Sequence, residues 1–277
     1  MTPVKYGISF TVQHLNQAGA LVHVYSDGSI HLNHGGTEMG QGLNTKIAQI
    51  VAHGFGVDFN AVSISATRTD KVPNTSPTAA SSGTDLNGMA ALNAVNTIKE
   101  RLIDFITEHF EVDSNTVVFK DNLITFSKGE ISFSELANLA YMNRISLSST
   151  GYYATPKIHY DRAKGEGRPF LLRSRRSAQQ VEVDTLTGEN TVTRVDILHD
   201  VGSSINPALD MGQIEGAFVQ GMGWLTTEDL QWNDKGQLAS FGPANYKIPA
   251  IGDTLPNLTS IFITQQIQKP PCLDQKP

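Results

Sequence analysis

Hydrophobic and polar positions in the first part of the chain alternate as in two β-strands joined by a tight turn. Residues 20–25 predict the first strand, Asp27-Gly28 predicts the hairpin turn, and residues 29–33 predict the returning strand. Beyond them, apolar residues recur at helical spacing: Leu43, Ile47, Ile50 and Val51. The pattern therefore predicts a hairpin that leads through residues 34–42 into a helix.

The middle of the chain predicts a long helix, a second hairpin and a shorter helix. The loop of residues 73–84, rich in Pro, Ser, Thr and Ala, precedes the long helix. One apolar face marks that helix: Ile98, Leu102, Phe105, Ile106 and Phe110. Residues 115–126 predict a hairpin that turns at Asp121-Asn122, and residues 134–143 predict a helix with Ser134 as its N-cap.

Strands and helices continue to mix in the rest of the chain. Further strands are predicted at residues 62–67, 146–153, 180–184 and 191–198, with a turn at Leu186-Thr187-Gly188 before the last of them. Pro207 stands near the start of another helix, whose apolar residues are Ile214, Ala217, Phe218 and Met222. Mixed elements with hairpin connections predict an α+β fold, with mixed sheets and packed helices.

Composition narrows the class of protein. A chain of 277 residues with 39% hydrophobic and 17% charged residues is globular and long enough for one large domain or two modest ones. A net charge of −6 argues against a nucleic-acid surface, and no apolar run suggests a membrane span or a signal peptide. The single cysteine, Cys272, excludes an internal disulfide and a cysteine-cluster metal site. We therefore expect a cytoplasmic protein.

The stretch His34–Gly42 is the most informative part of the sequence. It holds four glycines in nine positions, with the amide side chain of Gln41 among them. A glycine-rich strand-to-helix turn lets a ligand approach the main chain closely, and the helix start beyond it favours an anion.

Two other segments have the same character, namely the loop of residues 73–84 and the helix start at residues 206–216. Each offers backbone N–H groups and a small or amide side chain. Helix starts suit a phosphate, and an amide suits a flat polar heterocycle because it both donates and accepts hydrogen bonds. We therefore expect the three segments to converge on one phosphorylated heterocyclic ligand.

Simpler interpretations compete with this one. The glycine-rich turn has a purely conformational explanation, Met39 is also suited to the core, and Gln213 to a solvated helix surface. Ordinary N-caps would equally explain the hydroxyl residues Thr78, Ser81, Ser82 and Thr84. The Walker phosphate loop is disfavoured because Leu43-Asn44-Thr45 follows Gly42, and the Rossmann fingerprint lacks its acidic ribose partner.

Two charged or metal-binding features also have simpler explanations. His31 and His34 stand three residues apart, but no third ligand completes a recognisable metal pattern, so a structural role is favoured. The basic residues of the segment 157–168 alternate with acidic ones, which favours a solvated surface or a subunit contact.

Several long motifs, in order, carry a resemblance to a known family. They are residues 34–42, Pro73–Ser81, Asp85–Gly88, Gly165–Phe170, Asp200–Ser203, Asn206-Pro207, Gly212–Gly221 and Tyr246–Pro249. Together they resemble the molybdopterin-binding large subunit of the xanthine dehydrogenase and aldehyde oxidase family, from about Pro3 to about Phe262. The resemblance implies that the fold is the second half of that molybdopterin-binding domain.

The resemblance also implies a function and a set of cofactor contacts. Family members hydroxylate purines and related heterocycles, such as hypoxanthine and xanthine to urate, with water as the oxygen source. Molybdenum is held by the dithiolene of the molybdopterin cofactor, so no protein residue is expected to ligate it directly. The implied contacts are Met39, Gln41, Ala79, Ala80, Ser81 and Gln213. Where many relatives place a small hydroxyl residue, this chain has Gly83.

Family membership implies partners as well. They are subunits or domains that carry [2Fe–2S] clusters and FAD and pass electrons onward, with NAD as the expected final acceptor. The expected substrate is a purine-type small molecule, with no nucleic acid or membrane involved. The complete enzyme is expected to be an oligomer.

The catalytic glutamate of the family has no counterpart in this sequence. In the family, this general base lies in a Gly-Glu-Pro-Pro motif just beyond the region that matches residues 250–262, and here that motif is absent. Residues 263–277 match nothing in the family. If they are written with one plausible choice of codons and read in a shifted frame, the peptide ends in Phe-Arg-Ser-Lys-Ala, which resembles the family's sequence just before its catalytic glutamate. We therefore expect a molybdopterin-binding region at residues 1–262 and a frameshifted tail at residues 263–277.

A second departure concerns residues 171–178. Relatives have an aromatic, alanine- and glycine-rich strand there, whereas this chain has three arginines within four positions: Arg173, Arg175 and Arg176. Buried arginines would be costly, so either a second short frame slip or an exposed basic loop would explain the segment.

Since the first half of the family's molybdenum domain is also missing, the chain is expected to be an inactive C-terminal fragment that exposes apolar surface and aggregates. Two other hypotheses remain. One is a non-catalytic module for cofactor binding or assembly, and the other is an unrelated nucleotide-binding domain. Molybdenum content and phosphorus content distinguish the three.

Overall fold

The computed structural model describes residues 2–72, 74–169, 171–253 and 258–262, and its contacts divide the chain into two compact units. The central unit comprises Gly7–Leu172, and the terminal unit combines Met1–Tyr6 with Arg173–Pro277. Both units mix helices with sheets, so the predicted α+β class is confirmed. The predicted boundary at residue 262 stays a prediction, and the predicted frameshifted tail, residues 263–277, lies outside the described residues.

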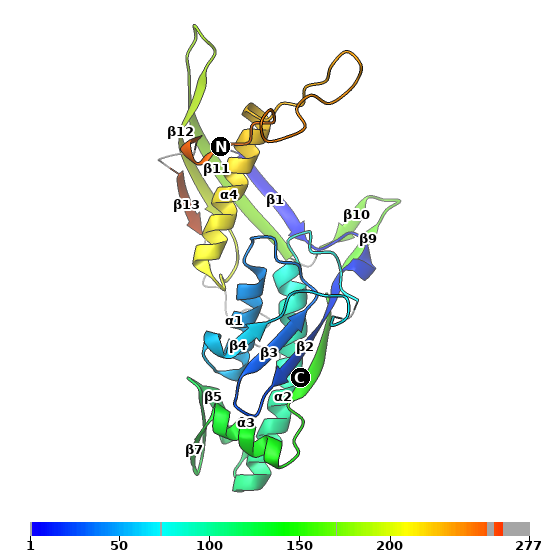
Figure 1. The fold of residues 1–277 in the computed structure, drawn as a ribbon, viewed down its shortest axis with the longest axis vertical. Helices are drawn as coiled ribbons and strands as arrows, with labels where there is room; N and C mark the ends of the chain where they lie inside the picture. Colours follow the sequence, from blue (N-terminus) through cyan, green and yellow to red (C-terminus); the bar gives the residue numbers. More distant parts are fainter. Residues whose placement is uncertain (1, 73, 170, 254–257, 263–277) are drawn as a thin grey trace. The chain divides into compact units, whose positions relative to one another are not determined.

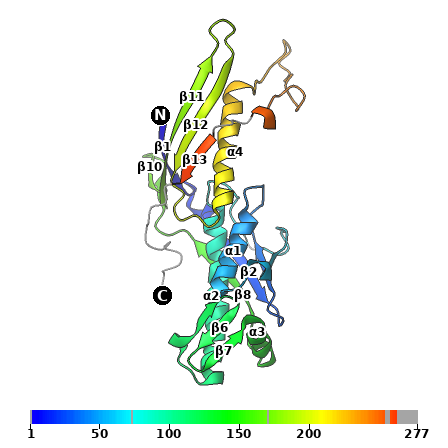
Figure 2. The ribbon, with the colours of Figure 1, turned by 90° about the vertical axis from the view of Figure 1, so that its left-hand side faces the viewer.

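A four-stranded sheet with the order β4-β3-β2-β8 forms the centre of the central unit (Figures 1 and 2). Strands β2 and β3 are the predicted hairpin, which turns at Gly28 with a φ of +86°. β8 is antiparallel to β2, whereas β4 is parallel to β3. The strands are β2 (Gln17–Val24), β3 (Ile30–His34), β4 (Val62–Ile64) and β8 (Ser148–Ala154).

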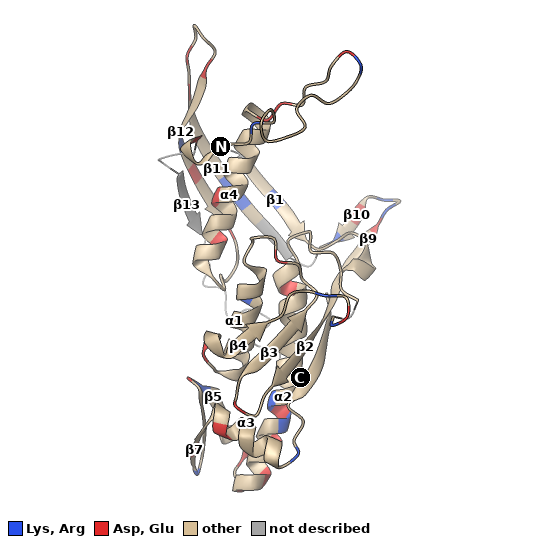
Figure 3. Cartoon of the chain, viewed as in Figure 1, with Lys and Arg blue, Asp and Glu red and all other residues tan. Residues whose placement is uncertain are grey.

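Two helices cover this sheet: α1 (Leu43–Phe55) and α2 (Gly83–Phe110). α2 packs on β2 and β8 and against α1. The predicted apolar face of α2 is confirmed, since Ile98, Leu102 and Ile106 are at most 1% exposed. Burial of each such side chain contributes about 1.5–3 kcal/mol to folding. Charged residues of both signs occupy the C-terminal half of α2 (Figure 3).

Helix α2 approaches β8 so closely that the strand needs a glycine. A Cβ atom at Gly151 would overlap the carbonyl oxygen of Ala90 and lie 2.6 Å from the backbone nitrogen of Ala94. On the open edge of β8, side chains of α2 replace a further strand. The Asn93 side chain donates to the carbonyl oxygen of Tyr152 at 2.7 Å, and Arg101 donates to that of Ser148 at 2.9 Å.

A small three-stranded sheet, β5-β6-β7, and helix α3 also belong to the central unit. The predicted turn is confirmed, because Asp121 and Asn122 both have positive φ between β5 and β6. The predicted N-cap Ser134 is wrong: Ser132 accepts a bond from the Glu135 N–H in a capping box. These elements are β5 (Val118–Lys120), β6 (Leu123–Phe126), β7 (Gly129–Ser132) and α3 (Phe133–Met142).

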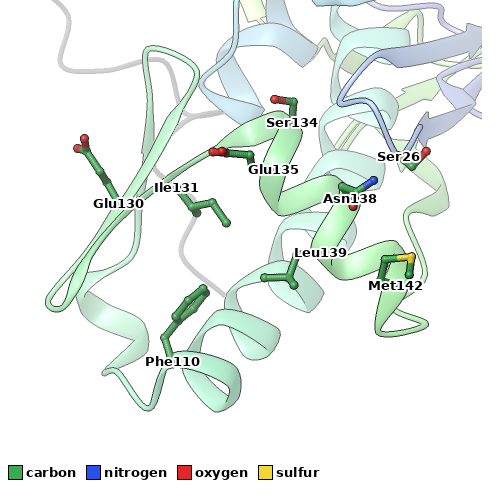
Figure 4. A pocket seen from close by; sticks show the side chains of 9 residues that line it. All are labelled: Ser26, Phe110, Glu130, Ile131, Ser134, Glu135, Asn138, Leu139 and Met142. Carbon is green, nitrogen blue, oxygen red and sulfur yellow. The ribbon is translucent and has the colours of Figure 1, made fainter.

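A pocket of about 660 Å³ lies between the small sheet, α3 and the end of α2 (Figure 4). Its lining is Ser26, Phe110, Glu130, Ile131, Ser134, Glu135, Asn138, Leu139 and Met142. None of these residues belongs to the motifs that carry the family resemblance.

The remaining elements of the central unit are short. A two-stranded hairpin pairs β9 (His159–Asp161) with β10 (Glu166–Arg168). Its basic residues are exposed, as a solvated surface requires. Three 3-10 helices lie at Gln13–Leu15, Phe59–Ala61 and Ser114–Thr116. β4 is shorter than the predicted strand of residues 62–67, because pairing with β3 ends at Ile64.

The terminal unit is built on a sheet with the order β1-β11-β12-β13. β11 and β12 form the hairpin predicted around Gly188, which has a φ of +78°. β13 lies parallel to β12 on its other side. The elements are β1 (Thr2–Ile8), β11 (Leu171–Val183), β12 (Asn190–His199), α4 (Pro207–Thr226), a 3-10 helix (Ile251–Asp253) and β13 (Leu258–Phe262).

The basic segment of residues 171–178 belongs to a strand, so its interpretation as a loop is wrong. β11 starts at Leu171, and Arg175 and Arg176 pair with His199 and Leu198 of β12. Both arginines are exposed, which avoids the desolvation penalty of a buried guanidinium. Inter-strand pairing decides this strand, since its own side-chain pattern lacks the alternation of a half-buried strand.

Helix α4 starts as predicted, but its apolar side chains are only partly buried or exposed. Only Gly223 is buried among its residues, and Trp224 and Leu225 are 70% and 79% exposed. Further large apolar side chains of the terminal unit are exposed: Leu230, Trp232, Phe241, Ile248 and Ile251. The predicted exposure of apolar surface is thus present, while aggregation stays a prediction. None of the helices in the described ranges has both the length and the apolar content to cross a bilayer.

Candidate cofactor-binding site

The glycine loop, residues 34–42, joins β3 to α1 and packs against the segment that precedes α2. A Cβ atom at Gly35 would overlap the Thr75 side chain, and one at Gly36 would lie 2.6 Å from Leu43. A hydrogen bond of 2.8 Å from the Thr37 N–H to the Thr78 hydroxyl connects the two segments directly. The structure therefore brings together two of the three segments that the sequence singled out.

A carboxylate from the loop itself occupies the start of α1. The Glu38 side chain accepts hydrogen bonds from the N–H groups of Gly40 at 2.9 Å, Gly42 at 3.0 Å and Asn44 at 2.9 Å. Burial alone would raise the pKa of Glu38, but these bonds outweigh it and lower the pKa. The expectation that this helix start receives an external anion is wrong, because Glu38 already provides the anion.

Gln41 and Met39 lie at the outer end of the glycine loop. The Gln41 side chain accepts from the Met39 N–H at 2.6 Å and donates to the Thr37 carbonyl at 2.9 Å. Met39 is 66% exposed, which excludes the interpretation of this residue as part of the core. The loop thus presents a thioether and an oriented amide at its surface.

The start of α2 differs from that of α1, because its N–H groups are open within the part of the chain that the structure describes. Ser82 is the N-cap but makes no side-chain capping bond, and its hydroxyl donates to the Ala79 carbonyl at 2.9 Å. No hydrogen bond joins the N–H groups of Gly83, Thr84 and Asp85 to other described residues. Since Thr78 accepts from the glycine loop, ordinary capping does not explain the hydroxyl residues of this segment.

The turn before α2 has an uncommon backbone. Ala80 and Ser81 are consecutive non-glycine residues with φ of +57° and +55°. Each such residue costs of order 1 kcal/mol, and such conformations cluster at ligand-binding sites. Ala79, Ala80 and Ser81 are all exposed. The backbone of Ala79 is bonded within the turn, to the Pro77 carbonyl and to Ser82, whereas the N–H groups of Ala80 and Ser81 have no hydrogen-bond partner among the described residues.

His34 supports the glycine loop from inside. It is 2% exposed, and its Nδ1 accepts from the Gly36 N–H at 3.1 Å. Burial lowers the pKa of His34 to about 4, so its ring is neutral at pH 7. His31 lies on β3 and is partly exposed, and burial lowers its pKa as well. Within the described ranges, no cluster of three or more His, Cys, Asp or Glu residues suits a metal ion.

Asp85 is a partly buried acid in the first turn of α2. Burial raises its pKa to about 6. No ion pair or hydrogen bond of its carboxylate is present among the described residues. Sequence reasoning missed the roles of both Glu38 and Asp85, although a single acid inside a glycine run and an acid at a helix start were visible signals.

The third segment lies in the terminal unit. Asn206 caps α4 by accepting from the Leu209 N–H at 3.1 Å, as its type and position suggest. Gln213 is exposed on the second turn of α4. Because Gln213 and the glycine loop belong to different units, their predicted convergence stays a prediction.

The cluster in the central unit fits a phosphorylated, polar heterocycle. An open helix start, two outward-facing left-handed residues and an oriented amide lie on segments that contact each other. A Cβ atom at Gly40 would meet nothing within 4 Å, so the surface above the glycine loop is clear of protein atoms. The N–H groups supply hydrogen-bond donors for a phosphate, and the Gln41 amide supplies a polar group for the edge of a ring. None of these groups carries a positive charge.

Comparisons with known proteins show the family of the chain. Residues 1–255 match the family described as the molybdopterin cofactor-binding domain. The chain is 47% identical to the xanthine dehydrogenase/oxidase of Gallus gallus over 97% of its own length and 19% of the relative. It is 45% identical to the xanthine dehydrogenase of Dictyostelium discoideum, over 97% of the chain and 20% of the relative. The chain thus spans about a fifth of the length of these curated relatives.

Solved structures share the fold. Quinoline 2-oxidoreductase from Pseudomonas putida aligns with a TM-score of 0.79 and 23% identity, over 95% of this chain and 34% of that one. The aldehyde oxidoreductase from Desulfovibrio desulfuricans aligns with a TM-score of 0.74 and 20% identity, over 95% and 26% of the two chains. Family match, sequence relatives and fold agree: the chain belongs to the molybdopterin-binding domain family of the xanthine dehydrogenase-like molybdenum hydroxylases.

Proposed function

We propose that this chain supplies one side of the molybdopterin site of an enzyme that hydroxylates purine-type heterocycles, hypoxanthine and xanthine to urate, with water as the oxygen source. The observation that carries the proposal is the open start of α2 in contact with the glycine loop. Relatives named xanthine dehydrogenase at 45% and 47% identity support the choice of substrate class.

The site residues have distinct roles in this proposal. The backbone N–H groups of Ala80, Ser81 and Gly83–Asp85 and the Ser81 hydroxyl hold the cofactor phosphate, because an open helix start favours an anion. Met39, Gln41 and Gln213 bind the pterin, with the two amides at its polar edge. Ala79 and Ala80 keep the wall beside the metal narrow. The cofactor supplies the molybdenum centre, held by its dithiolene, at which the substrate is oxidised.

We further propose that the chain acts with subunits or domains that carry [2Fe–2S] clusters and FAD, with NAD as final electron acceptor, in a cytoplasmic oligomer. Relatives named xanthine dehydrogenase support this arrangement at the level of the family.

Cofactor content tests the proposal. The chain of residues 1–277 is expressed in a host that makes molybdopterin, and molybdenum and the oxidised fluorescent pterin are measured per mole of folded protein. Near-stoichiometric values are expected for the wild type. Gln41→Ala is expected to lower both values, whereas Gln13→Ala, an exposed glutamine of the same unit, leaves them unchanged. A folded wild type without pterin contradicts the proposal, and bound phosphorus without molybdenum indicates a nucleotide-binding domain.

A second candidate function is cofactor binding or assembly without catalysis. It is favoured by one observation, namely that residues 263–277, which follow the last family-like segment, depart from the family pattern. Loaded protein that forms no urate from xanthine supports this second function and our expectation that the chain alone is inactive. Urate formation by the isolated loaded chain contradicts both.

We also propose that residues 263–277, and the arginine-rich start of β11, arose from short slips of the reading frame. The support is the mismatch of both stretches with the family pattern that surrounds them. Resequencing of the gene tests this idea, and an unbroken frame through both stretches would remove it.

A further inference from the structure

The helix starts of the two long helices in the central unit differ in how their N–H groups are satisfied. At α1, the carboxylate of Glu38 bonds to three N–H groups. At α2, Ser82 makes no side-chain cap, and the first N–H groups have no partner among the described residues. The chain thus fills the anion-binding position at the start of α1 with its own Glu38 carboxylate and leaves the position at the start of α2 open.

We infer that Glu38 is a positioning residue of the cofactor site: its carboxylate acts as a built-in anion that fixes the loop carrying Met39 and Gln41. The inference rests on the proposed function, because it assigns Glu38 a purpose in presenting these two residues. It also implies that an external anion is kept away from α1, since the negative charge of Glu38 already occupies that helix start.

The geometry explains why one side chain is sufficient. Oε1 of Glu38 accepts from Gly40 and Gly42, and Oε2 accepts from Asn44. The three donors follow Glu38 by two, four and six residues, so the carboxylate ties together both ends of the turn around Gln41.

The Gln41 amide then closes the same turn from the other side. It bonds to the Met39 N–H and the Thr37 carbonyl at 2.6 and 2.9 Å. Each end of the loop is therefore held by a side chain from within the loop, and Met39 stays exposed above it. A preorganised loop lowers the entropy lost when a ligand binds.

A glutamine is a poor substitute for Glu38, although its size is the same. A carboxylate offers two acceptor oxygens, whereas an amide offers one oxygen and one NH₂ donor. In Glu38→Gln, an NH₂ group would face an N–H donor, either at Asn44 or at the two glycines. An alanine removes all three bonds and the charge.

The first experiment measures amide exchange by NMR in the cofactor-free chain of residues 1–277. Glu38→Ala is expected to speed exchange at Gly42 and Asn44 by about tenfold or more, the scale of one lost charge-assisted hydrogen bond. Glu38→Gln is expected to fall between wild type and alanine. Glu108→Gln removes an equal charge from an exposed site on α2 and serves as the matched control.

Rescue by a small anion distinguishes an electrostatic role from a merely structural one. Sodium acetate is expected to restore protection at Gly42 and Asn44 in Glu38→Ala, whereas sodium chloride at equal ionic strength does not. Neither salt is expected to change the wild type at these amides. Equal exchange in wild type and Glu38→Ala, or equal rescue by chloride, would overturn the inference.

The second experiment connects the loop to the cofactor. Pterin content is measured for the wild type, Glu38→Ala and Glu108→Gln expressed in the molybdopterin-producing host. A loss of about tenfold in loading is expected for Glu38→Ala alone. Unloaded wild-type protein would refute the proposed function, whereas a loaded wild type with equally loaded Glu38→Ala would refute only the positioning role.

Discussion

Replacement of Asp85 by asparagine is expected to stabilise the central unit at neutral pH. Burial raises the pKa of Asp85 from 3.8 to about 6, and its carboxylate has no ion pair or hydrogen bond among the described residues. The folded state therefore binds this proton more tightly than the unfolded state does. Stability falls as pH rises from 3.8 through 6, and the full penalty applies at pH 7.

The magnitude follows from the pKa change. A rise from 3.8 to about 6 corresponds to about 3 kcal/mol, because one pKa unit is worth about 1.4 kcal/mol. Asp85 lies in the first turn of α2, where the helix dipole stabilises a negative charge by about 0.3–1 kcal/mol. Asp85→Asn is therefore expected to raise the free energy of unfolding by about 2–3 kcal/mol at pH 7 and to flatten its dependence on pH between 4 and 7.

Hydrogen exchange of the buried amides near Ile98 and Leu102 reports unfolding of the central unit. Both tryptophans, Trp224 and Trp232, lie in the terminal unit, so their fluorescence provides an internal control that the substitution leaves unchanged. Asp104→Asn, on an exposed position of the same helix, is the control variant. A less stable Asp85→Asn at pH 7, or an unchanged pH profile, would refute the reasoning.

Three further substitutions or conditions test other parts of the central unit. Gly83→Ser places a hydroxyl at the start of α2, and the added Cβ atom fits because it would lie 3.4 Å from the nearest atom of Leu43. The variant is expected to retain more cofactor than the wild type, and lower retention contradicts the proposed site. Burial lowers the pKa of His34 from 6.5 to about 4, so the free energy of unfolding is expected to fall by up to about 3 kcal/mol as the pH drops from 6.5 toward 4. Hydrogen exchange in the Asp85→Asn variant measures this fall without the contribution of Asp85, and a flat profile contradicts the burial of His34 as a neutral ring. Gly151→Ala is expected to destabilise the central unit by about 3 kcal/mol or more in urea unfolding, because the methyl group meets rigid backbone of α2; a stable variant contradicts this packing.

Local chemistry made much of the fold predictable. The turn at Gly28 and the turn at Asp121-Asn122 follow from residues that tolerate positive φ, and the structure has both. The buried face of α2 follows from apolar residues at helical spacing. The N-cap of α3 was also visible, since Ser132 and Glu135 form the Ser-x-x-Glu pattern of a capping box, but the nearby Ser134 obscured it.

Features that depend on distant parts of the chain escaped sequence reasoning. β11 (Leu171–Val183) is a strand because it lies between β1 and β12 in the sheet, and its exposed Arg175 and Arg176 give no alternating pattern. In the candidate site, residue types identified Gln41 and Ser81 as polar groups near helix starts, and the family motifs added Met39. They did not reveal which helix start is already filled.

The sequence by itself determined the α+β class, most element positions and the family, because these depend on local periodicity and on motifs in order. Tertiary structure alone decided that Glu38 occupies the start of α1, while α2 stays open beside it. The physical reason is that a hydrogen bond depends on the direction and distance of its groups in space. In the folded protein, the glycine loop has that geometry where it packs against the segment that contains Thr78.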